Sequence, residues 1–272
     1  MLRRSATPRR AEPTPEVGES GRPNGSPPLD FWTRYWEWPL HKFSDWLGVR
    51  VADKVICVSP RVRDEAIIYY GADQEKLAVV ENGVNVELFS PRPRKTSSAI
   101  NRDEVGESVG YQILYVGALQ PRKNVHLLIE ALSKLPGEYQ LTIVGKGDRD
   151  YEKRLHSLAT ELDLGSRVTF KGYIEYPKLP AIYQKADIFV IPSSYEGLPK
   201  VILEALACGV PVLASGFDIK NSIQGLHFLD SLDPKNIALK VIDILELKSS
   251  VDIILIQEKD HEPQKAKRLD LV

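Results

Sequence analysis

The chain contains 272 residues, of which 36 are basic and 37 acidic, so its formal net charge is -1. This near balance argues against nucleic acid as the main partner, and the apolar fraction of 43% suits a globular protein with a sizeable core. Two cysteines far apart in the sequence, Cys57 and Cys208, exclude a disulfide scaffold, and no apolar run approaches the roughly 18–20 residues that span a bilayer.

The composition changes sharply near residue 30. Residues 1–30 are rich in Pro, Gly, Ser and charge, which predicts a disordered tail, and they lack the apolar stretch of a secretion signal, so we expect a cytoplasmic protein. Residues 31–47 hold all four tryptophans. Trp32, Trp36, Leu40, Phe43 and Leu47 recur there at helical spacing, and Pro39 is expected to kink or break that helix. Two interpretations of this aromatic segment remain open. It packs against the protein or a partner chain, which we favour, or it contacts a membrane peripherally.

Short strands and helices alternate from residue 51 onward. The pattern first predicts a strand at 54–59, a helix at 60–70 that Gly71 ends, and a strand at 77–81. Residues 92–109 are polar and without periodicity, which indicates a linker. Beyond the linker we expect strands at 111–116, 139–144, 168–170, 187–191 and 210–214, and helices at about 124–135, 149–163, 178–186 and 199–208.

The second half of the chain predicts an α/β fold with a doubly wound, Rossmann-like parallel sheet. Its short apolar runs do not alternate with polar residues, and an amphipathic helix follows each of them. Ligands of such sheets bind at the carboxyl ends of the strands. The search for a functional site therefore narrows to the loops that follow the strands.

The loop after strand 111–116 combines a glycine with two cations. Gly117 allows the backbone to approach a ligand closely, and Arg122 and Lys123 stand just before a helix start, where amide groups and the helix dipole favour an anion. Two cations at this position suit a diphosphate. The alternative is a solvated basic turn.

The loop after strand 139–144 carries a weaker signal. Gly145 and Gly147 form a GxG, which by itself is a poor indicator of nucleotide binding. Asp148 and Asp150 have the spacing of a pair that can hold a divalent metal. We favour helix capping for them, because the pair opens a helix, and the sequence gives no reason to require a metal cofactor.

The strongest candidate loop follows strand 187–191. Glu196 and Gly197 stand at the mouth of a helix that Pro199 opens, and Glu204 lies within the apolar helix run VILEALAC. A buried ionised carboxylate needs a partner, and the two hydroxyls of a ligand would suit it. The alternative for Glu204 is an exposed ion pair with Lys200.

These residues resemble the retaining glycosyltransferases of family 4, which have the GT-B fold. Glu196 and Glu204 are separated by seven residues within YEGLPKVILEALACGVPVLAS, as in the EX7E signature of that family, and GALQPRKN resembles its donor-phosphate loop. VADKVICVSPRVRDEAIIYYG and KLAVVENGVNVELFSP resemble the end of its N-terminal domain. The match runs from about Val51 to Glu246.

The resemblance implies a nucleoside-diphosphate sugar donor and a hexosyltransferase-type reaction with retention of configuration. Arg122, Lys123 and Glu196 would be catalytic, because they would hold the leaving diphosphate and the transferred sugar. The donor would also contact Gly117, Gly145, Gly172, Tyr173, Gly197, Leu198, Pro199 and Glu204. The acceptor, a sugar or a lipid-linked molecule, is not identified by the sequence.

The resemblance also divides the chain. Residues 31–91 would be a partial N-terminal domain with the interdomain crossing, 110–247 the donor-binding domain, and 248–272 a tail of uncertain structure. Because the N-terminal part is short, a second interpretation is a non-catalytic donor-binding or regulatory subunit that needs a partner chain for the acceptor site. A sugar-nucleotide epimerase is the less favoured third interpretation.

Overall fold

The structure is a computed structural model that describes residues 38–91, 110–219 and 222–260. The predicted tail and the predicted linker therefore lie outside the described residues. The chain divides into two compact units, residues 1–51 and 52–272. This division does not coincide with the predicted boundary at the linker, because residues 52–91 group with the second unit.

The described part of the first unit is one helix, α2 (Trp38–Val51). Pro39 lies in the first turn of α2, where proline is tolerated because the first amide groups of a helix have no intrahelical partner to lose. Residues 31–37 lie outside the described residues, so the predicted kink or break of a helix over 31–47 stays a prediction. The rings of Phe43 and Trp46 stack with centroids 5.7 Å apart, and the Arg50 guanidinium lies 4.6 Å from the Trp46 ring centroid. The other tryptophans' side chains lie outside the description, so both interpretations of the aromatic segment stay open.

The second unit begins with a small α/β element, as predicted. Strands β1 (Val55–Cys57) and β2 (Leu77–Val79) pair in parallel, and α3 (Pro60–Tyr70) connects them, followed by the short 3-10 helix η2 (Gln74–Lys76). The side-chain oxygen of Ser59 accepts a hydrogen bond from the Val62 amide and caps α3. Gly71, with φ 64°, ends the helix in the left-handed conformation.

The main body is a six-stranded parallel sheet in the order β5-β4-β3-β6-β7-β8. This order reverses direction between β3 and β6, which confirms the doubly wound class. Its strands are β3 (Gln112–Val116), β4 (Gln140–Val144), β5 (Val168–Gly172), β6 (Ile188–Ile191), β7 (Val212–Ala214) and β8 (Leu226–Phe228).

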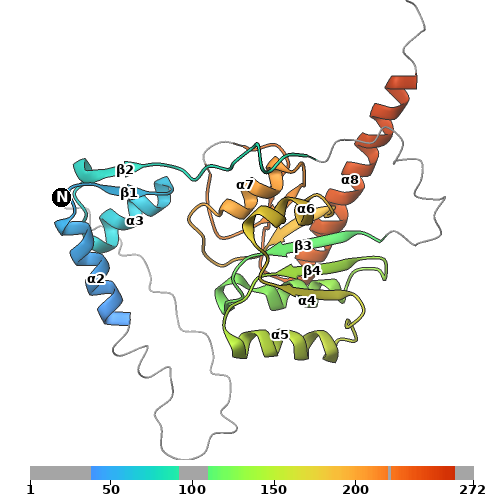
Figure 1. Ribbon diagram of the computed structural model, residues 1–272, viewed down its shortest axis with the longest axis horizontal. Coiled ribbons are helices and arrows are strands. Elements are labelled where there is room, and N and C mark those ends of the chain that lie inside the picture. Colours follow the sequence, from blue (N-terminus) through green and yellow to red (C-terminus); the bar gives the residue numbers. More distant parts are fainter. Residues whose placement is uncertain (1–37, 92–109, 220–221, 261–272) are drawn as a thin grey trace, which may run out of the picture. The chain divides into compact units, whose positions relative to one another are not determined.

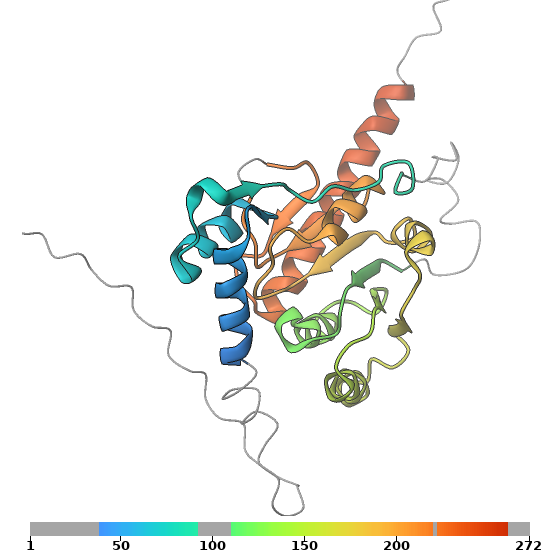
Figure 2. The ribbon, with the colours of Figure 1, turned by 60° about the vertical axis from the view of Figure 1, so that its left-hand side comes forward.

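Helices cover both faces of this sheet, with α4 and α5 on one side and α6 and α7 on the other (Figures 1 and 2). Buried Leu, Ile, Val and aromatic side chains between these layers form the core. The helical segments are η3 (Pro121–Lys123), α4 (Val125–Leu132), α5 (Arg149–Glu161), η4 (Tyr176–Lys178), α6 (Leu179–Tyr183), α7 (Lys200–Ala207) and α8 (Pro234–Asp260). The predicted strands and helices up to residue 214 are each present within a few residues.

Two elements near the C-terminus were not predicted. β8 is a three-residue strand with mixed polarity, so it carries no pattern that a sequence window detects. α8 continues to Asp260, which corrects the expected tail of uncertain structure over residues 248–260. Its first half packs against α4 through the buried side chains of Ile237, Val241 and Leu245.

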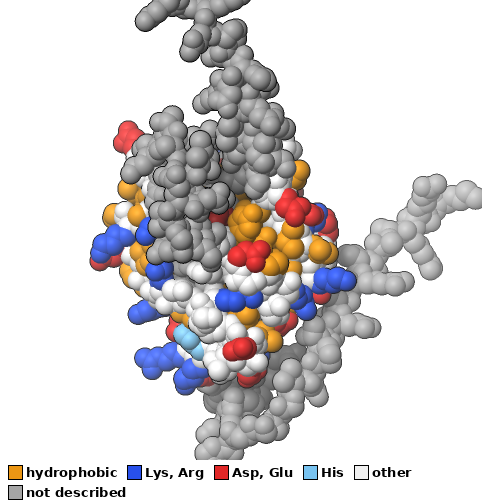
Figure 3. All heavy atoms as spheres, turned by 90° about the vertical axis from the view of Figure 1, so that its right-hand side faces the viewer, with side chains coloured by type: hydrophobic (Ala, Val, Ile, Leu, Met, Phe, Trp, Pro, Cys, Tyr) orange, Lys and Arg blue, Asp and Glu red, His pale blue; other side chains and the backbone are white. Residues whose placement is uncertain are grey.

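The outer surface agrees with the balanced composition. On the face drawn in Figure 3, basic and acidic side chains both occur among apolar and neutral surface. Among the helices that the structure describes, none combines the length and the apolar character needed to cross a bilayer.

Candidate functional site

The loops after β3 and β6 lie against each other at the carboxyl edge of the sheet. The Ser194 amide donates a hydrogen bond to the Arg122 carbonyl at 2.9 Å. The Asn124 side-chain amide donates to the Pro192 carbonyl at 2.9 Å and to the Ser194 hydroxyl at 2.8 Å. Asn124, with φ 52°, also separates η3 from α4. Because β3 and β6 are neighbouring parallel strands, two segments 70 residues apart form one edge.

The predicted catalytic residues meet in this edge. The Lys123 ammonium forms a close ion pair with the Glu196 carboxylate, and both side chains are buried, with 11% and 9% of their surface exposed. Arg122 lies further out: one guanidinium nitrogen is 4.0 Å from Glu196 and donates to the Tyr195 carbonyl at 3.1 Å. The Glu196 amide donates to the Gly216 carbonyl, which fixes its backbone.

Burial and the Glu196 carboxylate together raise the pKa of Tyr115, which lies on β3 beneath the pair. Its hydroxyl therefore stays protonated and donates to the Ala118 carbonyl at 3.0 Å. A methyl group on Gly117 would lie 2.9 Å from this hydroxyl oxygen, so the loop passes directly over the ring. Tyr115 therefore packs beneath this loop and stabilises it, a role that could not be predicted from the sequence.

Glu204 is buried on α7 with 4% of its surface exposed. One carboxylate oxygen accepts a hydrogen bond from the Tyr183 hydroxyl of α6 at 2.9 Å, and the other has no hydrogen-bond partner among the described residues. Burial raises the pKa of this carboxyl, which the Tyr183 bond and the charge of Lys200 partly offset. The exposed ion pair with Lys200 that the sequence left open is therefore not formed.

Glu204 has no described hydrogen bond or ion pair with the cationic residues at the loop edge. Its link to Glu196 is α7 itself, which begins directly after the loop that carries Glu196. Pro199 precedes the first helical residue, one position earlier than expected, and no side chain caps the helix. The Ile202 amide donates to the Pro199 carbonyl at 3.2 Å, so among the described residues the Lys200 and Val201 amides are the ones left for another acceptor.

The glycines of the β3 and β4 loops serve close packing. A methyl group on Gly145, which has φ 139°, would lie 1.8 Å from the Gly117 carbonyl oxygen, and one on Gly147 would lie 2.0 Å from that of Leu119. The Gly145 amide in turn donates to the Gly172 carbonyl at 2.8 Å. These contacts continue the backbone pairing into the loops that follow the strands. Close packing of the two loops is therefore enough to explain the glycines at 145 and 147 without a ligand.

The Asp148 carboxylate caps α5, as the sequence analysis favoured. It accepts hydrogen bonds from the Asp150 and Tyr151 amides at 3.0 and 2.8 Å. Asp150 instead lies 3.7 Å from the Lys153 ammonium. In the described ranges, no group of three or more His, Cys, Asp and Glu side chains is arranged to hold a metal ion.

Residues of α3, which precedes the predicted linker, also contact the loop that carries Glu196. The sequence analysis did not predict these contacts. The Arg61 guanidinium of α3 lies 4.8 Å from the Tyr195 ring centroid and donates to the Gly216 carbonyl at 3.3 Å. The Tyr195 hydroxyl donates to Glu65, and burial together with this bond raises its pKa to about 12. These contacts join residues more than 100 positions apart, so no local pattern predicts them.

Two more residues of the same loop contact this segment. A methyl group on Gly197 would lie 2.9 Å from a methyl carbon of Val58, so glycine is required for the close approach. The Asn82 side-chain amide donates to the Leu198 carbonyl at 2.6 Å. Tyr173, by contrast, is 69% exposed after β5.

The parallel sheet with its site at the carboxyl edge defines the class of protein, an α/β fold of the GT-B glycosyltransferase type. The chain belongs to the family described as glycosyl transferases group 1, whose profile matches residues 99–267. A second profile, Glycosyltransferase Family 4, matches residues 23–88. The resemblance stated from the sequence is thereby confirmed.

Individual relatives agree with this family. An uncharacterised glycosyltransferase of Methanocaldococcus jannaschii is 31% identical over 74% of this chain and 53% of its own length. A D-inositol 3-phosphate glycosyltransferase of Mycobacteroides abscessus is 33% identical over 60% of this chain and 37% of its own length. The Anabaena protein HepE, solved in complex with UDP-glucose, matches with a TM-score of 0.66 and 26% identity over 79% of this chain and 60% of its own. The chain thus spans between 37% and 60% of the length of these three relatives.

Proposed function

We propose that this chain binds a nucleoside-diphosphate sugar at the edge formed by the β3 and β6 loops and acts in glycosyl transfer with retention of configuration. The observation that carries the proposal is the buried Lys123–Glu196 ion pair beside Arg122. Such charges are costly to bury and are unusual without a function. The UDP-glucose complex of HepE, a solved structure of the same fold, supports a donor of this kind.

Each residue has a role in this proposal. Arg122 and Lys123 hold the diphosphate and stabilise the negative charge that develops as it leaves, without a metal. Glu196 accepts hydrogen bonds from the sugar hydroxyls, and the uncapped first turn of α7 faces an oxygen of the donor. The oxygen of Glu204 that has no described partner accepts from the ribose hydroxyls.

Gly117, Gly145, Gly172, Gly197 and Leu198 keep the backbone close to the donor in the same proposal. Tyr173 extends from the end of β5 toward the nucleobase side, and its exposure leaves the ring free to stack on a base. Pro199 sets the start of α7 and so the position of its first amide groups.

Calorimetric titration with UDP and GDP tests the donor site. We expect one of the two to bind, and Lys123→Met and Glu204→Gln each to weaken it by about 10-fold or more, because each removes a contact to a charged group. Lys134→Met, an exposed lysine after α4, is the matched control and should leave the affinity unchanged. No binding of either nucleotide at millimolar concentration would exclude the proposal.

The stereochemistry of the reaction is tested separately. The protein is incubated with an α-linked UDP-hexose, and proton NMR follows the anomeric signal of the first sugar product. Retention predicts that the α-anomer forms first. A β-anomer as the first product would contradict retention while leaving the donor site in place.

A further inference from the structure

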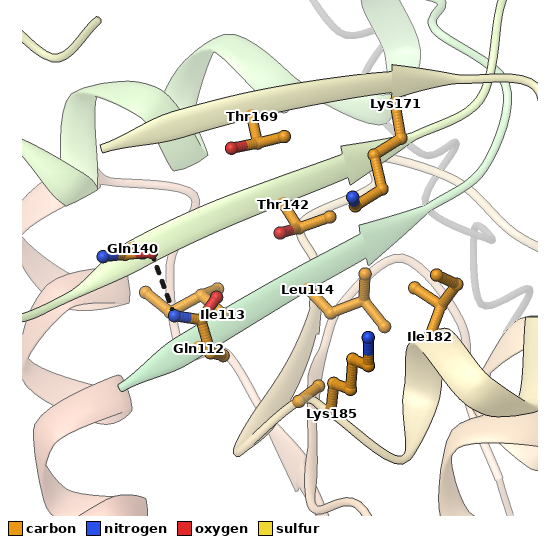
Figure 4. Close-up of a pocket in the computed structure, with 10 residues that line it drawn as sticks. Gln112, Ile113, Leu114, Gln140, Thr142, Thr169, Lys171, Ile182 and Lys185 are labelled. Atoms are coloured by element: carbon orange, nitrogen blue, oxygen red, sulfur yellow. Dashed lines mark hydrogen bonds between the residues drawn. The ribbon is translucent and has the colours of Figure 1, made fainter. Parts of the chain in front are cut away.

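A cavity of about 310 Å³ lies on the face of the sheet that carries α6, away from the Lys123–Glu196 pair. Its floor is made by alternate residues of three neighbouring strands: Gln112 and Leu114 of β3, Gln140 and Thr142 of β4, and Thr169 and Lys171 of β5 (Figure 4). The end of α6 supplies one wall, with Ile182 and Lys185. α6 has only five residues, and side chains of β4 and β5 line the cavity beside it.

Two lysines without acidic partners face this cavity. Lys171 reaches in from β5 and Lys185 from the segment after α6, so the two ammonium groups approach the same space from opposite sides (Figure 4). Neither forms an ion pair within the described part of the chain, and no acidic side chain lines the cavity. The carboxylate that lies nearest in sequence, Asp187, accepts from the Gln112 amide at 2.9 Å.

The rest of the lining is uncharged and about half of it is apolar, with Ile113, Leu114, Ile182 and Ala186 beside four polar side chains. The hydroxyls of Thr142 and Thr169 project from the strands between the lysines and the two glutamines (Figure 4). The side chains of Gln112 and Gln140 bond to each other at 3.0 Å and close one end. Hydroxyl and amide groups of this kind bind polyols, whereas two unpaired cations bind an anion.

We propose that this cavity is a second binding site, for a small phosphorylated polyol of monosaccharide size. The volume of about 310 Å³ lies at the lower end of the range of about 300–1,000 Å³ for ligand pockets and suits an occupant smaller than a nucleotide sugar. Lys171 and Lys185 hold the phosphate, and Thr142, Thr169 and the glutamine pair bind the hydroxyls. None of these six residues is among those assigned to the donor above, although Lys171 directly precedes Gly172 and Tyr173, so the Lys123→Met control below separates the two sites.

The experiment uses the full chain and three probes: glucose 6-phosphate, glucose and inorganic phosphate. Amide NMR shifts are followed during each titration at low salt. We expect glucose 6-phosphate to bind in the millimolar range or tighter, with shifts at Thr142, Thr169 and Lys171, and to bind more tightly than glucose or phosphate. Lys171→Met and Lys185→Met should each weaken it about 10-fold, since each removes one charged contact.

Three controls make the result decisive. Lys134→Met should bind like the unchanged protein, and Lys171→Arg, which keeps the charge if Lys171→Met fails to fold, should keep most of the affinity. Lys123→Met should leave the shifts at Thr142 and Thr169 in place. The proposal is overturned if glucose 6-phosphate does not bind, or if it binds equally well to the Lys171→Met, Lys185→Met and unchanged proteins.

Discussion

At the scale of single residues, the Lys123–Glu196 pair is the most consequential contact. Removing one member of a buried ion pair leaves the other charge without compensation, whereas removing both leaves a neutral site. We therefore predict that Lys123→Met lowers the free energy of unfolding by about 3 kcal/mol, and that the double variant Lys123→Met, Glu196→Gln recovers much of the loss. Urea unfolding of both variants measures this, and a double variant that is no more stable than Lys123→Met would contradict the prediction.

The buried carboxyl of Glu204 predicts a pH dependence. Because burial raises its pKa, the folded state holds the proton at a higher pH than the unfolded state does. Stability therefore falls as the pH rises through the unfolded and then the folded pKa. Glu204→Gln, which still accepts from Tyr183, removes this loss.

We predict that Glu204→Gln and the unchanged protein unfold with similar free energies near pH 4, and that the variant becomes the more stable of the two as the pH rises to 7. Thermal or urea unfolding across this pH range checks the difference. Glu161→Gln, at an exposed carboxylate, is the control and should show no such trend. A difference that does not grow with pH would contradict the burial argument.

At the scale of elements, α3 controls the loop that carries Glu196. Arg61 packs on Tyr195 and bonds to Gly216, and the Gly216 carbonyl also accepts from the Glu196 amide. We predict that Arg61→Ala raises the hydrogen-exchange rate of the Glu196 amide about 10-fold, because local opening becomes easier. Arg63→Ala removes a contact with Asp64 on the exposed side of α3 and should leave that rate unchanged. Equal exchange in both variants would show that α3 does not hold the loop.

The packing of the β3 and β4 loops gives a second test at this scale. Gly145→Ala would place a methyl group 1.8 Å from the Gly117 carbonyl at a φ that favours glycine, so we predict a loss of about 3 kcal/mol or more in unfolding free energy. Gly137→Ala is the matched control, because its methyl group would meet nothing within 4 Å and should change stability by less than about 0.5 kcal/mol. Similar losses of unfolding free energy in Gly145→Ala and Gly137→Ala would contradict the conclusion that close packing explains the glycines of the GxG.

The elements also show what the sequence reveals. Strands β3, β4 and β6 are apolar runs that are bounded by clear turns, so their positions and parallel arrangement could be predicted. The contact of Arg122 and Lys123 with Glu196 follows from adjacent parallel strands, once their order is known. Tyr183 beneath Glu204 and Arg61 on Tyr195 depend on how helices pack across the sheet, and no local pattern encodes that. β8 and the cavity beside α6 depend on the same long-range packing.

At the scale of the whole molecule, the described residues combine a six-stranded GT-B type sheet with a short α/β segment that contains β1, α3 and β2. That segment contacts the Glu196 loop at Tyr195, Gly197 and Leu198. Binding of a donor therefore depends, in our proposal, on both parts of the second unit. The acceptor lies outside what the described residues define.

A crystal structure of this chain with UDP tests whether Lys123, Glu196 and Glu204 serve one nucleotide-sugar site. We predict difference density for the diphosphate against Arg122 and Lys123 and for the ribose against the Glu204 carboxylate. UDP bound at another place, with Glu204 contacting only Tyr183, would contradict it.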